Sequence, residues 1–189
     1  MASADDQPRV LFKYLPTKFL ADVLRGRILF RNLAYFQQVE DTARGDLTEG
    51  MHIDKPDNPV TVESQDGRVN IQGAFAFHSE VNQERVFAFC LSTRLAPELL
   101  SEFGCDACVE IFDVSGFVAR VRAAVRRSPT LAKVGLLAGP VEYYRTNDTA
   151  QMNIKDPTKL PFFKPVRFSS QFEYRLVCAQ GGGLGPLGR

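Results

Sequence analysis

The chain has 189 residues, of which 44% are hydrophobic and 24% are charged. These values are typical of one globular domain and exclude a disordered or low-complexity chain. The formal net charge of +1 excludes the overall basic character by which many proteins bind nucleic acid or anionic membranes, and it leaves a local basic patch open. No stretch approaches the roughly 20 apolar residues that a membrane-spanning helix needs. We therefore expect a cytoplasmic protein with no membrane partner.

Cysteines and histidines give no metal-binding pattern. Cys105 and Cys108 form a C-x-x-C pair, but no second Cys or His pair lies at zinc-ligand spacing, and His52 and His78 are isolated. We expect reduced thiols packed as small hydrophobic groups and no metal site.

The amino-terminal part predicts a strand, a helix and a second strand. Val10–Leu15 is rich in β-forming residues and ends before Pro16. Thr17 is a suitable N-cap for a helix that stops at Gly26, where glycine favours the left-handed conformation. Residues 28–30 begin the next predicted strand.

The middle of the chain predicts the sheet centre. Two β-rich runs, Val69–Phe77 and Arg85–Leu91, flank a polar segment and predict a hairpin-like pair. A short helix over Pro97–Phe103 and a strand over Val109–Phe112 follow. Asp113 is placed to cap a longer helix.

The predicted long helix has an apolar face and a basic face. The apolar residues at helical spacing are Phe117, Val121, Ala124 and Val125. The arginines are Arg120, Arg122, Arg126 and Arg127. We favour a solvated helix face for these arginines over a phosphate-binding patch.

The whole pattern predicts a single α+β domain over residues 1–189. Strands over Val141–Tyr144 and Phe172–Ala179 follow the long helix, and few regular βαβ units occur, which favours a mostly antiparallel sheet over a doubly wound one. We expect the core at about residues 9–179 and flexible ends at 1–8 and 181–189.

The loop over residues 35–50 carries many specific polar residues. Two aromatic residues, Tyr35 and Phe36, begin it. Four carboxylates follow, which are Glu40, Asp41, Asp46 and Glu49. They can bind a divalent cation through oxygen atoms or form ion pairs with Arg44, and we favour the ion-paired network.

The last predicted strand carries a second group of polar residues. Period-two alternation places Gln171, Glu173 and Arg175 on one face. A carboxylate beside a Gln at this spacing can hold a ribose hydroxyl and stabilise the positive charge of an oxocarbenium-like transition state. A solvent-exposed ion pair between Glu173 and Arg175 is the alternative interpretation.

These segments together resemble a widespread bacterial domain-of-unknown-function family. Its members begin with a Lys-Tyr strand, continue through a helix into a Leu-Phe and Tyr-Phe segment and an acidic loop, and end on Glu-x-Arg. The matching residues are Lys13-Tyr14, Leu29-Phe30, Leu33 to Phe36, Glu40-Asp41, Arg44-Gly45-Asp46, Glu49-Gly50, Glu173 and Arg175. Many relatives have Phe-Asn-Asp where this chain has Phe36-Gln37-Gln38.

The same order resembles the three-part layout of ADP-ribosyltransferases. These enzymes combine a His or Arg on the first strand, a central Ser-Thr-Ser or Tyr, and a Gln-x-Glu or Glu-x-Glu on the last strand. Here Gln171-Phe172-Glu173 matches the third part and residues 89–93 match the second imperfectly. Lys13 stands where His or Arg is usual, and it offers a point charge without the bidentate fork of Arg.

The resemblance implies an enzyme that uses NAD and modifies an unknown macromolecular acceptor, protein or nucleic acid, as a toxin or phage-defence effector. Glu173 would hold the nicotinamide ribose, and Gln171 would orient the acceptor. The expected NAD-binding residues are Lys13, Tyr14, Tyr35, Phe36, Arg44, Ser92 and Thr93. The expected accessory residues are Glu40, Asp46, Glu49 and Arg175.

Two other functions fit the same sequence. A non-catalytic module that binds nucleic acid or protein would use Arg44 and the helix arginines, and its binding to phosphates would weaken with salt. A metal-dependent hydrolase would use Glu40, Asp46 and Glu49 and would need a divalent cation.

Overall fold

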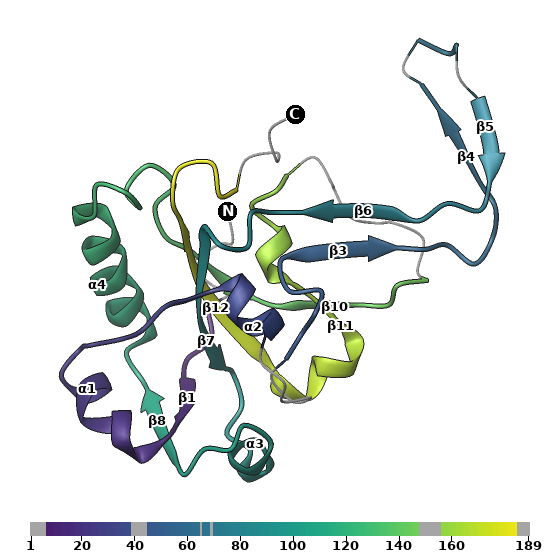
Figure 1. Cartoon of the computed structure of the whole chain (residues 1–189). Helices are drawn as coiled ribbons and strands as arrows, with labels where there is room; N and C mark the ends of the chain where they lie inside the picture. Colours follow the sequence, from purple (N-terminus) through teal and green to yellow (C-terminus); the bar gives the residue numbers. More distant parts are fainter. Residues whose placement is uncertain (1–6, 39–44, 65, 69, 148–155, 185–189) are drawn as a thin grey trace.

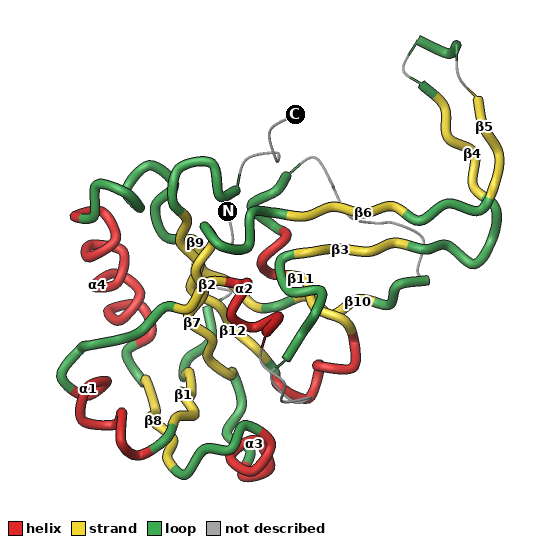
Figure 2. The backbone as a smooth tube through the Cα atoms, in the orientation of Figure 1, coloured by secondary structure: helices red, strands yellow, loops and turns green. Residues whose placement is uncertain are grey.

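A computed structural model describes residues 7–38, 45–64, 66–68, 70–147 and 156–184. Strands make up its centre (Figure 2). The main sheet has six antiparallel strands, in the order β8-β1-β7-β12-β9, with β2 also paired to β7. Their bounds are β1 Leu11–Leu15, β2 Arg31–Asn32, β7 Val86–Ser92, β8 Ala107–Ile111, β9 Leu137–Pro140 and β12 Glu173–Ala179.

The sheet opens between β1 and β7. These strands share one paired position, Phe12 with Ser92, whereas β7 pairs with β12 along its whole length. The other end of the same β7 edge pairs with β2, through Ala88 and Phe87. A side chain bridges the gap, because the Nζ atom of Lys13 donates to the Cys90 carbonyl oxygen at 2.8 Å. The opening is therefore part of the fold and not a frayed edge.

Helix α4, Val114–Arg127, covers one face of the sheet (Figure 1). Its buried residues, Val118, Val121 and Val125 among them, pack with Leu176 and Tyr174 of β12. The apolar spacing of three and four residues produces this face. The predicted cap is confirmed, since the Asp113 side chain accepts from the Gly116 amide at 2.9 Å. The predicted apolar face is confirmed for Phe117, Val121 and Val125, whereas Ala124 is exposed.

Strand β12 is buried on both faces. Tyr174, Leu176 and Cys178 face α4, while Val177 and Ala179 belong to a second core with Leu33, Val81, Val86, Ala88, Leu160 and Leu184. A strand covered on both sides explains the nearly continuous apolar run after Arg175. Leu184 lies beyond the expected core boundary at residue 179, yet its side chain is buried.

Four short helical segments lie outside the main sheet. They are η2 Thr17–Phe19, α1 Leu20–Leu24, α2 Leu33–Gln38 and α3 Pro97–Glu102. Gly26 follows α1 with a φ of 78°, as expected for a glycine stop. The prediction that a strand begins at residues 28–30 is wrong, because strand pairing begins only at Arg31.

Two antiparallel strand pairs form an arm that extends from the sheet (Figure 1). One pairs β3, Met51–Asp54, with β6, Phe77–Glu80, and the other pairs β4, Val60–Glu63, with β5, Asn70–Gly73. The predicted hairpin between residues 69–77 and 85–91 is therefore wrong. Residues 70–73 of the first run form β5 and pair with β4, Phe77 begins β6, which pairs with β3, and β7 pairs inside the main sheet.

A parallel strand pair and two 3-10 helices precede β12 in the chain. Strands β10, Glu142–Tyr144, and β11, Phe163–Pro165, form a parallel pair. The 3-10 helices η3, Leu160–Phe162, and η4, Val166–Gln171, flank β11. The fold is mixed, with mostly antiparallel sheets and few helices, as the α+β prediction states. Within the described ranges, no helix is long and apolar enough to cross a membrane.

The position of Leu176 gives a stability test of this core. Leu176 is 0% exposed and lies between the sheet and α4, whereas Leu24 is 69% exposed. We expect Leu176→Ala to lower the free energy of unfolding by about 2–5 kcal/mol, because it leaves a cavity. Leu24→Ala, the matched control, should change it by less than about 0.5 kcal/mol. Urea unfolding measures both, and equal effects would contradict the packing described.

Candidate functional site

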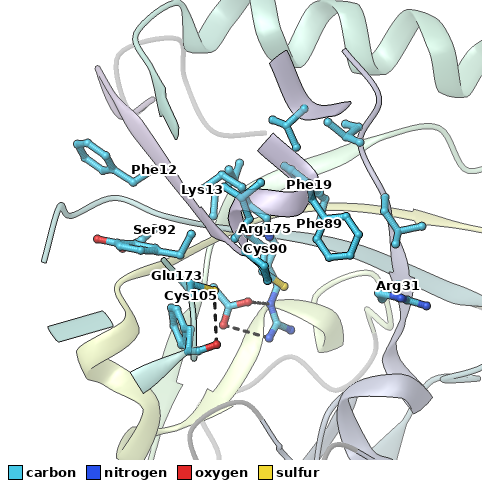
Figure 3. A pocket seen from close by; sticks show the side chains of 18 of the residues that line it. Phe12, Lys13, Phe19, Arg31, Phe89, Cys90, Ser92, Cys105, Glu173 and Arg175 are labelled. Carbon is cyan, nitrogen blue, oxygen red and sulfur yellow. Dashed lines mark hydrogen bonds and ion pairs between the residues drawn. The ribbon is translucent and has the colours of Figure 1, made fainter. Parts of the chain in front are cut away.

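A pocket lies at the opening of the sheet. Its volume is about 520 Å³, within the range of about 300–1,000 Å³ that is usual for small-molecule sites. Residues of β1, β7 and β12 line one side, and the chain from η2 to α2 lines the other. Figure 3 shows Lys13, Cys90, Glu173 and Arg175 close together in this pocket.

The backbone before β12 is fixed by a set of local hydrogen bonds. The Ser92 hydroxyl donates to the Gln171 carbonyl oxygen at 2.9 Å, and the Thr93 amide donates to that of Phe172 at 2.8 Å. Phe172 is left-handed, with a φ of 45°. The Glu173 amide donates to the Tyr143 hydroxyl at 2.8 Å. Ser92 and Thr93 thus hold the backbone from which Gln171 and Glu173 project.

The two predicted catalytic residues meet at a third side chain. The Nζ atom of Lys164 donates to Gln171 Oε1 at 2.9 Å and to Glu173 Oε2 at 3.1 Å. Arg175 Nε donates to Glu173 Oε1 at 2.7 Å. Gln171 lies in η4, outside the strand, so Lys164 and the bend at Phe172 bring it to Glu173.

Arg175 also joins the acidic loop to the last strand. Its guanidinium binds both carboxylate oxygens of Glu49, with Nη2 at 3.0 Å from Oε2, and donates to the Pro161 carbonyl oxygen at 2.5 Å. Arg175 and Glu49 are each 1% exposed. Two buried cations, Lys164 and Arg175, thus face two buried carboxylates, Glu49 and Glu173. We call these four residues the buried ion network.

The network keeps Glu173, Lys164 and Arg175 charged. Burial alone would raise the pKa of Glu173, but Arg175 and Lys164 outweigh burial and hold this pKa well below its ordinary value. Burial acts to lower the pKa of Lys164 and Arg175, and the Glu173 and Glu49 carboxylates outweigh it and raise the pKa of both. Glu173 is therefore ionised at neutral pH and suits the role of an electrostatic group, not a proton donor.

Lys13 lies in the gap between β1 and β7. Besides its bond to the Cys90 carbonyl, its Nζ atom is 4.6 Å from the centroid of the Phe89 ring. Burial lowers the pKa of Lys13, and the neighbouring Cys90 and Glu173 oppose this shift. Burial, with the Glu173 charge, also raises the pKa of the Cys90 thiol to about 12. That thiol is therefore protonated and a poor nucleophile.

The predicted aromatic residues lie at different depths. The Tyr14 side chain is buried against Phe103, and its hydroxyl accepts from the Ala96 amide at 2.7 Å. Tyr35 and Phe36 of α2 also line the pocket, and Tyr35 is exposed. Tyr14 is anchored in the wall, whereas Tyr35 lies at the mouth.

Only the second half of the acidic segment from Glu40 to Glu49 is described by the structure. Glu40, Asp41 and Arg44 lie outside the described residues. Asp46 is buried and accepts from the Thr48 hydroxyl at 2.6 Å, while Glu49 belongs to the buried ion network. In the described part of the chain, no three His, Cys, Asp or Glu side chains are arranged to hold a metal ion. Glu49 pairs with Arg175 of the last strand, and its carboxylate also lies 4.0 Å from the Nζ atom of Lys164.

Lys164 is the residue of the site that the sequence analysis missed. It follows Phe163 and precedes Pro165 in a segment that looks like a loop. One signal could have found it: a single Lys between two apolar residues, in a run that ends just before the polar face of the last strand. The helix arginines, in contrast, are exposed on α4 and do not line the pocket.

Comparison with known proteins gives no match, whether to a family model, a curated protein or a solved structure. The two resemblances drawn from the sequence therefore stay predictions.

The lowered pKa of Glu173 predicts an acid-sensitive contribution to stability. Its folded pKa is below the ordinary value of 4.5, so the unfolded chain takes up the proton first as the pH falls. The stabilising effect is full above about pH 4.5 and declines below it. The difference in unfolding free energy between wild type and Glu173→Gln should therefore narrow as the pH is lowered from 7 to 3. A difference that stays constant in urea titrations would contradict the ion network.

Proposed function

We propose that the chain is an ADP-ribosyltransferase-like enzyme that cleaves NAD between nicotinamide and ribose. The bond from the ribose anomeric carbon to the nicotinamide nitrogen breaks, and its electron pair leaves with nicotinamide. A nucleophilic oxygen or nitrogen of an acceptor, or water, then bonds to the anomeric carbon and loses a proton. The cleavage passes through an oxocarbenium-like transition state, in which positive charge develops at the anomeric carbon.

The single observation that carries this proposal is an ionised carboxylate in the wall of a pocket of about 520 Å³. Glu173 lines the pocket and is held by Arg175 and Lys164 in one orientation. A fixed negative charge beside the anomeric carbon stabilises the positive charge that develops there. Because the carboxylate is already oriented, little reorganisation is needed during the reaction.

The charge balance of the site supports the same role. Two cations beside Glu173 would by themselves make the site positive and oppose an oxocarbenium-like centre. Glu49 supplies a second negative charge that balances the two cations, because its carboxylate pairs with Arg175 and lies 4.0 Å from the Nζ atom of Lys164. Glu173 can thus be oriented by two cations while the four-residue network stays neutral.

The arrangement of the strands supports it further. The segments that resemble the three parts of the ADP-ribosyltransferase layout lie on adjacent strands, β1, β7 and β12. Lys13, Ser92 and Glu173 belong to these strands and all line the pocket at the opening between β1 and β7. In this proposal NAD binds across the opening, Lys13 contacts a phosphate or ribose oxygen, and Gln171 orients the acceptor.

The experiment is nicotinamide release from NAD by purified wild type and by Glu173→Gln. We expect the variant to lose at least about 100-fold in rate, since it removes the negative charge that stabilises the positive charge developing in the transition state. Glu110→Gln is the matched control, because Glu110 is an exposed carboxylate on β8 of the same sheet. It should release nicotinamide like wild type.

Melting curves are needed for all three proteins, because Glu173 also stabilises the fold. A Glu173→Gln protein that is folded and releases nicotinamide at the wild-type rate would contradict the proposal. A wild-type protein that neither releases nicotinamide nor is stabilised by NAD, with candidate protein and nucleic-acid acceptors present, would contradict it as well.

A further inference from the structure

The basic side chains that line the pocket differ in how their charge is balanced. Lys164 and Arg175 face two carboxylates, and Arg27 forms an exposed ion pair with Asp22. The other two are Lys13 and Arg31. Among the residues that the structure describes, neither of these has a carboxylate within ion-pair distance. The pocket therefore offers two cations without a partner of opposite charge.

Arg31 is held at the mouth of the pocket by its surroundings. Its backbone pairs with Ala88 of β7 where the sheet opens. Its guanidinium carbon is 4.6 Å from the centroid of the Tyr35 ring, a cation–π contact that restrains the guanidinium plane. Asn32 fixes the start of α2, since its side chain accepts from the Tyr35 amide at 3.0 Å. Arg31 is thus exposed but restrained.

Lys13 is the second basic residue of the pocket without a carboxylate partner among the described residues. An ammonium group has three donors, and the bond to the Cys90 carbonyl uses one of them. Lys13 belongs to β1 and Arg31 to β2, so the two cations come from different strands that border the same opening. Figure 3 shows Arg31 on the other side of Phe89 from Glu173 and Cys105.

We propose that Arg31 and Lys13 together bind the pyrophosphate of a dinucleotide in this pocket. Arg binds two phosphate oxygens at once through its planar fork, while Lys acts as a point charge. A pyrophosphate carries two separate negative groups and so can meet both cations. The choice of a dinucleotide rests on the proposed function, in which Glu173 takes the nicotinamide ribose.

Exposed apolar residues that line the same pocket as Arg31 fit the remaining part of such a ligand. Phe19 is 48% exposed and Leu29 is 62% exposed, and both line the pocket with Tyr35. Exposed apolar groups around a pocket mouth are suited to cover a flat base. The base would then lie near Arg31, away from Glu173.

The test is isothermal titration calorimetry with ADP-ribose, ADP and adenosine, none of which has a nicotinamide bond to cleave. Wild type should bind ADP-ribose and ADP more tightly than adenosine. Arg31→Gln should weaken ADP binding by about tenfold or more, because a hydrogen bond to a charged group is lost. Lys13→Met should weaken it likewise. Arg25→Gln is the matched control, since Arg25 is exposed on the same segment but does not line the pocket.

Two results would overturn the inference. One is equal binding of adenosine and ADP by wild type, and the other is ADP binding by a folded Arg31→Gln protein as tight as that of wild type. Failure of the proposed NAD cleavage can be distinguished from failure of the phosphate site. A chain that prefers ADP to adenosine through Arg31 but releases no nicotinamide from NAD supports the phosphate site and contradicts the cleavage of NAD.

Discussion

A buried guanidinium is the constraint on which the rest of the site depends. Arg175 lies on a strand that is covered on both faces, and removing its charge from water without partners would be strongly unfavourable. Its partners come from two distant parts of the chain: Glu49 ends the acidic loop, and Glu173 begins β12. Folding therefore has to bring the loop and the strand together. The ion network is a condition of the fold as well as a feature of the pocket.

The same network that stabilises the fold also orients the Glu173 carboxylate in the pocket. Glu173 is fixed by groups that also neutralise each other, so its carboxylate is oriented without being cancelled by an excess of positive charge. The opening between β1 and β7 supplies space beside this carboxylate, and Lys13 satisfies the Cys90 carbonyl in the gap. A continuous ladder between β1 and β7 would fill that space. The gap in backbone pairing is thus what allows a pocket to form in the middle of a sheet.

Local signals predicted the elements that depend on local physics. The cap at Asp113 and the apolar spacing of α4 follow from helix geometry, and the alternation of β12 placed Glu173 and Arg175 on one face. A lone Lys between apolar residues marks Lys164, but its contacts with Gln171 and Glu173 could not be predicted, because they depend on how a Pro-flanked segment packs against β12. The paired arm was also missed, since alternation shows that Val69–Phe77 can form a strand but not which strand it joins.

The most direct test of the account is a crystal structure with a non-cleavable NAD analogue bound. The account predicts that the analogue lies across the opening between β1 and β7, with the nicotinamide ribose beside the Glu173 carboxylate and with the buried ion network intact. An analogue bound elsewhere, or bound in the pocket with its nicotinamide ribose away from Glu173, would contradict the account.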